Sequence, residues 1–163
     1  MPETIPTLEE RVQRIEDDAA ITRLMYEYAG LCDNGYDPDA IIDLFARDTD
    51  VRWKSDVFGE FVGRDAIHEY FRQITKDFLW AAHFMINPVI DVDGDTARGS
   101  WRLFEPATLS STTGSATPDA VVVTAEYANT FVREDGRWRF ASIELTTQHI
   151  TNWDQGWVRQ QFR

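Results

Sequence analysis

The sequence has little of what disulfide-bonded, secreted or membrane-spanning proteins depend on. Cys32 is the single cysteine among 163 residues, so no disulfide can form within the chain. The longest apolar runs are far too short to cross a bilayer. The first ten residues, MPETIPTLEE, have neither the basic start nor the apolar core of a signal peptide. We therefore expect a cytoplasmic protein that does not act at a membrane.

Basic residues are also scarce. The chain has 16 Lys and Arg and 28 Asp and Glu, which gives a net charge of −12. A field of this sign repels nucleic acid and anionic lipid surfaces, so we expect neither as a partner. Metal-binding motifs are missing as well. His68, His83 and His149 are scattered, and there are no cysteine pairs and no HExxH spacing. We expect no metal site.

Apolar side chains, in contrast, are abundant. Hydrophobic residues make up 43% of the chain and aromatic residues 13%, including six Trp and ten Phe. This is enough apolar surface to pack one core and to line a cavity as well. The length is close to that of one domain, and no linker rich in Pro, Gly or Ser divides the chain. We expect a single domain over residues 1–163 with one apolar small-molecule pocket.

The first half of the sequence has a helical pattern. Thr7 followed by Glu10 is a capping box, which predicts a helix that starts near residue 7. Its apolar stripe ends at Asn34-Gly35, a typical helix stop. The period of the apolar residues predicts two further helices, over residues 39–45 and 64–78, and a short strand pair between them that includes residues 51–53 and 58–62.

From residue 81 the period changes from helical to two. Asp93-Gly94, a loop over residues 107–118 rich in Ser, Thr and Gly, and Asp135-Gly136 separate the expected strands. Because the side-chain phase slips within the last strand, we expect a bulge near Ala141-Ser142. Helices followed by an antiparallel meander predict an α+β fold: a cone-shaped, curved antiparallel sheet wrapped around the N-terminal helices. The four long strands are expected at about 82–92, 95–105, 120–133 and 137–150.

Three polar residues stand where apolar ones are expected, and each has two interpretations. Asp33 either points inward over the sheet or is an ordinary turn aspartate at the helix end. His83 opens the first long strand and is either a functional group or a hydrogen-bonded core histidine. Glu105 shares a strand face with Trp101, where burial would raise its carboxyl pKa, unless the strand frays at Pro106.

Two further positions also leave alternatives open. Helical geometry places Tyr26 almost above Asp33, whereas Tyr28 lies well round the helix. In the last strand, counting by twos from the expected bulge puts Thr147 and His149 on the inward face. His149 is then either a residue of the sheet rim or a second histidine that reaches the pocket.

The order of several local sequences carries a family resemblance. The chain contains six local sequences in this order: IxxLMYEYAGLCDNG, DLFARD, GRDAIHEYF, AAHFMINP, GSWRLFE and YANTFVREDGRW. Over about residues 15–150 this order resembles the SnoaL-like branch of the nuclear transport factor 2 and ketosteroid isomerase superfamily. In layout it is most similar to bile-acid 7α-dehydratase, scytalone dehydratase and hexachlorocyclohexane dehydrochlorinase. The resemblance implies the cone fold and a homo-oligomer, either a trimer or a dimer.

The resemblance also implies roles for individual residues. It implies that Asp33 and His83 act as a catalytic pair, and that Tyr28 and Glu105 assist them. The bile-acid dehydratase pattern has an arginine in the last strand, where this sequence has Thr147 or Gln148. The residues that we expect to bind substrate are Tyr26, Trp53, Trp101, Tyr127, Asn129, Thr147 and His149.

The function hypothesis is therefore a dehydratase that needs no cofactor. Asp33 would fix the tautomer of His83, which would abstract a carbon-bound proton from a hydrophobic polycyclic, steroid-like or polyketide-like substrate. An isomerase or a cyclase would use the same proton abstraction. A non-catalytic β-type subunit of a ring-hydroxylating dioxygenase, or a binding protein for an apolar metabolite, are alternatives from other classes.

Overall fold

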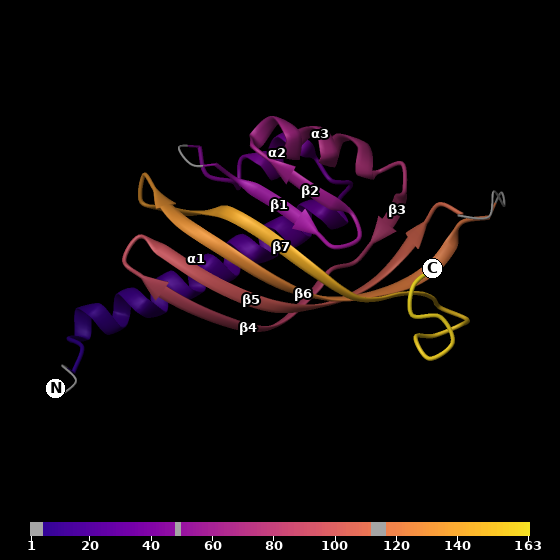
Figure 1. Ribbon diagram of the computed structural model, residues 1–163. Helices are drawn as coiled ribbons and strands as arrows, with labels where there is room; N and C mark the ends of the chain where they lie inside the picture. Colours follow the sequence, from indigo (N-terminus) through magenta and orange to yellow (C-terminus); the bar gives the residue numbers. More distant parts are fainter. Residues whose placement is uncertain (1–4, 48–49, 112–116) are drawn as a thin grey trace.

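The computed structural model describes residues 5–47, 50–111 and 117–163, and it shows a long sheet that curls around helices in a half-barrel (Figure 1). The sheet order is β2-β1-β7-β6-β5-β3, and β4 also pairs with β5. The expected mixed α+β cone is confirmed. Its strands are β1 (Arg52–Ser55), β2 (Gly59–Val62), β3 (Phe78–Ala81), β4 (Phe84–Asp93), β5 (Thr96–Leu109), β6 (Asp119–Glu134) and β7 (Arg137–Asn152).

The long first helix, α1 (Leu8–Asp33), begins and ends where the sequence predicts. Thr7 Oγ1 accepts from the Glu10 backbone N at 3.2 Å, and Glu10 Oε2 accepts from the Thr7 backbone N at 2.7 Å. This reciprocal capping box satisfies two backbone donors that the helix would otherwise leave free. At the other end the chain turns through Gly35, whose φ of +97° favours glycine.

The two short helices end earlier than predicted. The second, α2 (Pro38–Ile42), stops before Phe45, because Phe45 makes a parallel bridge to Phe140 of β7. The third, α3 (Arg64–Ile74), does not reach Phe78 as expected. Phe78 instead opens β3 opposite Leu109 of β5, so pairing with the sheet replaces the last helical turn.

The meander of β4 to β7 is antiparallel as predicted, whereas β1 joins β7 in parallel. The predicted end of β5 near Glu105 was wrong. The strand runs through Pro106 to Leu109, because β6 pairs with it as far as Asp119. The loop expected over residues 107–118 is therefore shorter, and its residues 112–116 lie outside the described part of the chain.

The strand β7 carries two bulges. The first is the predicted one, since Phe131 faces Phe140 and Thr130 faces Ser142, which leaves Ala141 as the extra residue. The second was not predicted and has Gln148 as its extra residue. Each bulge changes which side chains of β7 point inward, because the alternation of the strand slips by one residue.

Apolar side chains also remain on the outer face of the sheet. Phe84 and Phe104 are exposed there, with ring centroids 6.2 Å apart, and Trp80 and Ile86 are exposed beside them. An exposed apolar patch of this kind is typical of an interaction surface, and the homo-oligomer stays a prediction. Within the described ranges, no helix combines the length and the apolar character that crossing a bilayer would require.

A buried carboxylate attaches α1 to the end of the sheet. Asp17 is 4% exposed, and its Oδ1 accepts from Arg133 Nη2 at 2.8 Å and from Trp138 Nε1 at 3.0 Å. The Arg133 guanidinium also lies over the Trp138 ring, 4.3 Å from its centroid. Burial by itself would raise the pKa of Asp17, but the hydrogen bonds from Trp138, Arg133 and Gln13 outweigh it and lower that pKa.

Replacing Asp17 with Asn is expected to lower the free energy of unfolding by about 2 kcal/mol, because it removes the charge that partners Arg133. Asp18→Asn is the matched control, since Asp18 is exposed and the change in net charge is equal. Urea denaturation at neutral pH measures both. The difference should shrink as the pH falls through the lowered pKa of Asp17, where the wild-type carboxylate also loses its charge. Equal stability of the two variants at neutral pH would contradict this role.

Candidate functional site

The site begins with one carboxylate oxygen that binds two groups of the same histidine. Asp33 is the last residue of α1, and its Oδ1 accepts from the backbone N of His83 at 2.9 Å. The same oxygen lies 2.7 Å from His83 Nδ1. Because a carboxylate only accepts, Nδ1 carries a proton, and in the neutral ring Nε2 then holds the lone pair. Asp33 therefore sets both the position and the tautomer of the ring.

His83 is held in a break in the sheet rather than within a strand. It lies between β3 and β4, both of which pair with β5. The Ala82 backbone N donates to the Pro106 carbonyl at 3.1 Å, which holds this break against β5. The His83 side chain is only 6% exposed.

Glu105 completes the site from β5. Its Oε1 lies 3.7 Å from His83 Nε2, and the residue is 4% exposed. Strand alternation places Glu105 on the inner face as predicted, and the continuation of β5 past Pro106 excludes fraying. Among the residues that the structure describes, Glu105 Oε1 has no hydrogen-bond partner.

Burial and neighbouring charges shift the pKa values of Glu105 and His83. Burial raises the pKa of Glu105, the His83 charge lowers it, and the Asp33 charge raises it, to about 7 in total. For His83, burial lowers the pKa, but the Glu105 charge and the Asp33 hydrogen bond outweigh it, so the pKa rises above its ordinary value. Near neutral pH the cluster therefore shares protons among its members, and its titration belongs to the group as a whole.

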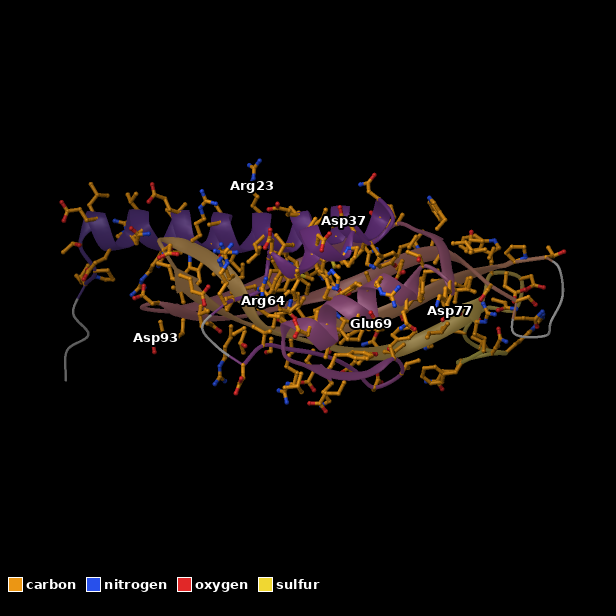
Figure 2. The ribbon with its side chains drawn as sticks, turned by 90° about the horizontal axis from the view of Figure 1, so that it is seen from above. Arg23, Asp37, Arg64, Glu69, Asp77 and Asp93 are labelled. Carbon is orange, nitrogen blue, oxygen red and sulfur yellow. The ribbon has the colours of Figure 1, made fainter. Side chains whose placement is uncertain are left out.

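The tyrosine alternatives are resolved in favour of Tyr28 as the inward residue. Tyr28 is buried, and its hydroxyl accepts from Trp53 Nε1 at 3.0 Å. Tyr26 is 50% exposed, so the geometric expectation that it faces inward above Asp33 was wrong, and its binding of substrate stays a prediction. It shares a helix face with Arg23, three residues earlier, which points away from the sheet in Figure 2. Asp33 lies on the same side of α1 as Tyr26, but its side chain can reach His83 because it is the last residue of the helix.

The other expected substrate-binding residues divide between the two faces of the sheet. The inner face carries buried Trp101, Tyr127, Asn129 and Thr147. Within the described part of the chain, Trp101 Nε1, Asn129 Oδ1 and Thr147 Oγ1 have no hydrogen-bond partner. The burial of these polar atoms without a partner costs desolvation free energy.

His149 lies on the outer face, so the expectation that it shares a face with Thr147 was wrong. The bulge at Gln148 causes the difference, because it pairs His149 with Thr124 and leaves Ile150 to point inward. The His149 Nδ1 lies 2.8 Å from Thr124 Oγ1, and its ring is 6.1 Å from that of Trp157.

Two tyrosines of the site were missed in the sequence. The Tyr36 ring meets that of His83 edge-on at 6.3 Å, and its pKa is raised by burial and by the charges of Cys32 and Glu105. Tyr36 directly follows the turn signal Asn34-Gly35, so it belongs to no apolar period that would mark it as an interior residue. Tyr70 fits the apolar stripe of α3, so only its hydroxyl distinguishes it from a core residue.

A cavity of about 690 Å³ lies between α3, the turn that joins β1 to β2, and the start of β3, and we call it the α3 cavity. The rings of Phe58, Phe61, Tyr70 and Phe78 line it. Asp33, His83 and Glu105 are not among its lining residues, so this cavity does not have the predicted floor. The described residues also contain no group of three or more His, Cys, Asp or Glu able to hold a metal ion.

Comparisons with known proteins identify the fold and the family. No curated protein matches the chain significantly. A type 2 hexachlorocyclohexane dehydrochlorinase is similar with a TM-score of 0.76 and 18% identity, over 87% of this chain and 92% of that one. Two proteins from Novosphingobium aromaticivorans are also similar. One, named as a candidate scytalone dehydratase, has a TM-score of 0.73 and 24% identity, over 86% of this chain and 89% of that one.

The second protein from Novosphingobium aromaticivorans is named as a candidate aromatic ring hydroxylase. It has a TM-score of 0.70 and 25% identity, over 85% of this chain and 94% of that one. A structure from Streptomyces avermitilis, named as a candidate dehydratase of the NTF2-like family, has a TM-score of 0.69 and 14% identity, over 81% of this chain and 97% of that one. The model of the SnoaL-like domain matches residues 13–144, which is most of the chain. The protein therefore belongs to the SnoaL-like domain family.

Proposed function

We propose that the protein is a lyase, a dehydratase without a cofactor, that acts on a hydrophobic polycyclic, steroid-like or polyketide-like substrate. The observation that carries this proposal is the position of His83 between two carboxyl groups of different character. Asp33 binds the Nδ1 side of the ring, and Glu105 lies beside the Nε2 side. With His83 as the base and Glu105 as the acid, the site has the two groups that an elimination needs.

The reaction follows from these positions. His83 Nε2 takes a proton from a carbon next to a carbonyl group, and Asp33 stabilises the imidazolium that forms. The electron pair of the broken C–H bond forms the new double bond as the C–O bond breaks. Protonated Glu105 gives its proton to the leaving hydroxyl, so water departs. A proton transfer from His83 to Glu105 over their 3.7 Å separation then restores both groups.

Glu105 suits the acid role better than Tyr28 does. With a pKa of about 7, a large fraction of Glu105 is protonated at neutral pH. Burial raises the pKa of Tyr28 well above the ordinary value, so its hydroxyl, which accepts from Trp53, gives up its proton much less readily. We therefore assign Tyr28 to the support of Trp53 and the acid step to Glu105.

An isomerase or a cyclase is the alternative within the same chemistry, since proton abstraction by His83 is common to all three. Mass spectrometry of the product separates them, because only a dehydration loses water. The likeness to the candidate aromatic ring hydroxylase keeps a dioxygenase-associated role as a further alternative. That role does not require an acid beside His83, whereas Glu105 is buried there at a cost in desolvation.

The first test of the proposed function is the loss of His83. A panel of polycyclic β-hydroxy ketones is incubated with the protein, and products lighter by one water are sought. With a substrate in hand, His83→Asn is expected to lower kcat by at least about 100-fold, because it removes the general base. His68→Gln is the control, since His68 lies on α3 in contact with Asp39. Turnover by His83→Asn at the wild-type rate would refute the assignment.

The second test needs no substrate and measures the pKa of His83 by NMR. Glu105→Gln is expected to lower this pKa, because the charge of Glu105 contributes to raising it. Glu126→Gln is the control, as Glu126 is exposed and pairs with Arg102 on the outer face. A pKa of His83 that is equal in both variants would show that Glu105 does not act on the ring.

A further inference from the structure

The first half of α1 turns its polar side toward the rest of the molecule. Glu10, Gln13, Arg14 and Asp17 line a cleft together with the turn between β4 and β5 and with Arg133. Among residues 8–20, all of which the structure describes, only Asp17 is buried. This arrangement is the reverse of an ordinary surface helix, whose apolar side packs on its own core.

The apolar side of the same helix faces away from the sheet. Leu8 and Ile15 are 72% and 70% exposed, and Figure 1 shows the start of α1 projecting past the end of the sheet. In Figure 2 the neighbouring Arg23 points away from the body of the molecule. We call this face the outer stripe; its residues are Leu8, Val12, Ile15, Ala19, Thr22 and Tyr26.

The spacing of the outer stripe is that of a coiled coil. Its residues follow one another at alternating intervals of four and three, which is the heptad pattern of two helices packed side by side. The stripe is about 27 Å long at the rise of an α-helix. The a positions are Val12, Ala19 and Tyr26, and the d positions are Leu8, Ile15 and Thr22.

The charged residues beside the stripe complement a second copy of the same helix. Arg11 and Asp18 are at g positions, and Glu16 and Arg23 are at e positions. In a parallel pair each g residue faces the e residue five positions further along the other helix. Arg11 then faces the partner's Glu16, and Asp18 faces the partner's Arg23. Within the described part of the chain these four exposed residues form no ion pair.

Other occupants of the stripe fit less well. At full overlap, an antiparallel pair would place Glu16 opposite Glu16 of the partner subunit and Asp18 opposite the partner's Asp18, so like charges would meet. A membrane surface would meet the acidic flanks of the stripe and a net charge of −12. The charge pattern therefore favours a parallel second copy.

We propose that two copies of the chain associate through their α1 helices, whose outer stripes pack in parallel as a short two-stranded coiled coil. The apolar residues supply the affinity, and the exposed ion pairs, each of which adds little free energy, set the orientation. The interface is separate from Asp33 and from the apolar patch on the sheet, so it does not rest on the proposed function.

The direct test is cross-linking of the full chain through Ala19→Cys, with Ala20→Cys as the matched control. Both alanines are exposed, but only Ala19 belongs to the stripe. In a parallel pair equivalent a positions face each other, so oxidised glutathione should join the Ala19→Cys thiols at least about tenfold faster than those of the control. Electrophoresis without reductant measures the product. Cys32 is buried, and the wild type shows its background.

A second test measures self-association by sedimentation at micromolar to millimolar protein. Ile15→Glu should weaken the dimer at least about tenfold, because it places a charge in the apolar seam. Ile86→Glu is the control, since Ile86 is exposed on the outer face of the sheet. Circular dichroism verifies that both variants are folded.

A charge exchange tests the parallel orientation. Arg11→Glu should weaken the dimer by about fivefold or more, and Arg11→Glu combined with Glu16→Arg should restore it. Residues five apart do not face each other on one helix, so this rescue reports a contact between copies.

Three outcomes would overturn the proposal: equal cross-linking of Ala19→Cys and Ala20→Cys, self-association that Ile15→Glu leaves intact, or a charge exchange that does not restore the dimer. Self-association lost in Ile86→Glu and kept in Ile15→Glu would place the interface on the sheet. A dimer that persists in His83→Asn and shows the expected cross-link supports the proposal even if no turnover is ever found.

Discussion

The hydrogen bonds between Asp33 and His83 are the interaction on which the rest of the site depends. One carboxylate oxygen accepts from a backbone N and a ring N of the same residue, so it holds the chain and orients the side chain together. It also connects the end of α1 to the break between β3 and β4. This contact joins segments fifty residues apart in the sequence, at the point where the curled sheet meets the helix. The same contact therefore positions the end of α1 against the sheet and orients the ring on which the proposed chemistry depends.

Much of this arrangement could be predicted from local patterns. The capping box at Thr7, the stop at Asn34-Gly35 and the alternation that places Glu105 inside are all set by neighbouring residues. The end of α3 was missed because Phe78 fits a helical stripe as well as a strand. Only its pairing with Leu109, far along the chain, decides between the two. Local propensity is overridden there by tertiary contact.

The positions of His149 and of the cavity could not be found in this way. Counting by twos along β7 fails at Gln148, because a bulge depends on the register with β6 and not on the residue itself. The lining of the α3 cavity combines a turn, a helix and a strand start, and no sequence period connects them. Tyr70 is instructive, since its place in the apolar stripe of α3 conceals a buried hydroxyl that has no hydrogen-bond partner among the described residues.

The difference between the two carboxyl groups explains how one histidine can have both a charged hydrogen-bond acceptor and an acid beside it. The Asp33 side chain is 31% exposed and accepts two hydrogen bonds, so its charge is solvated by water and by donors. The Glu105 side chain is 5% exposed, and its Oε1 has no donor among the described residues, so its charge is costly and its pKa rises to about 7. Burial and the nearby Asp33 charge thus favour the protonated form of Glu105, the His83 charge opposes it, and the ring of His83 lies between the two carboxyl groups.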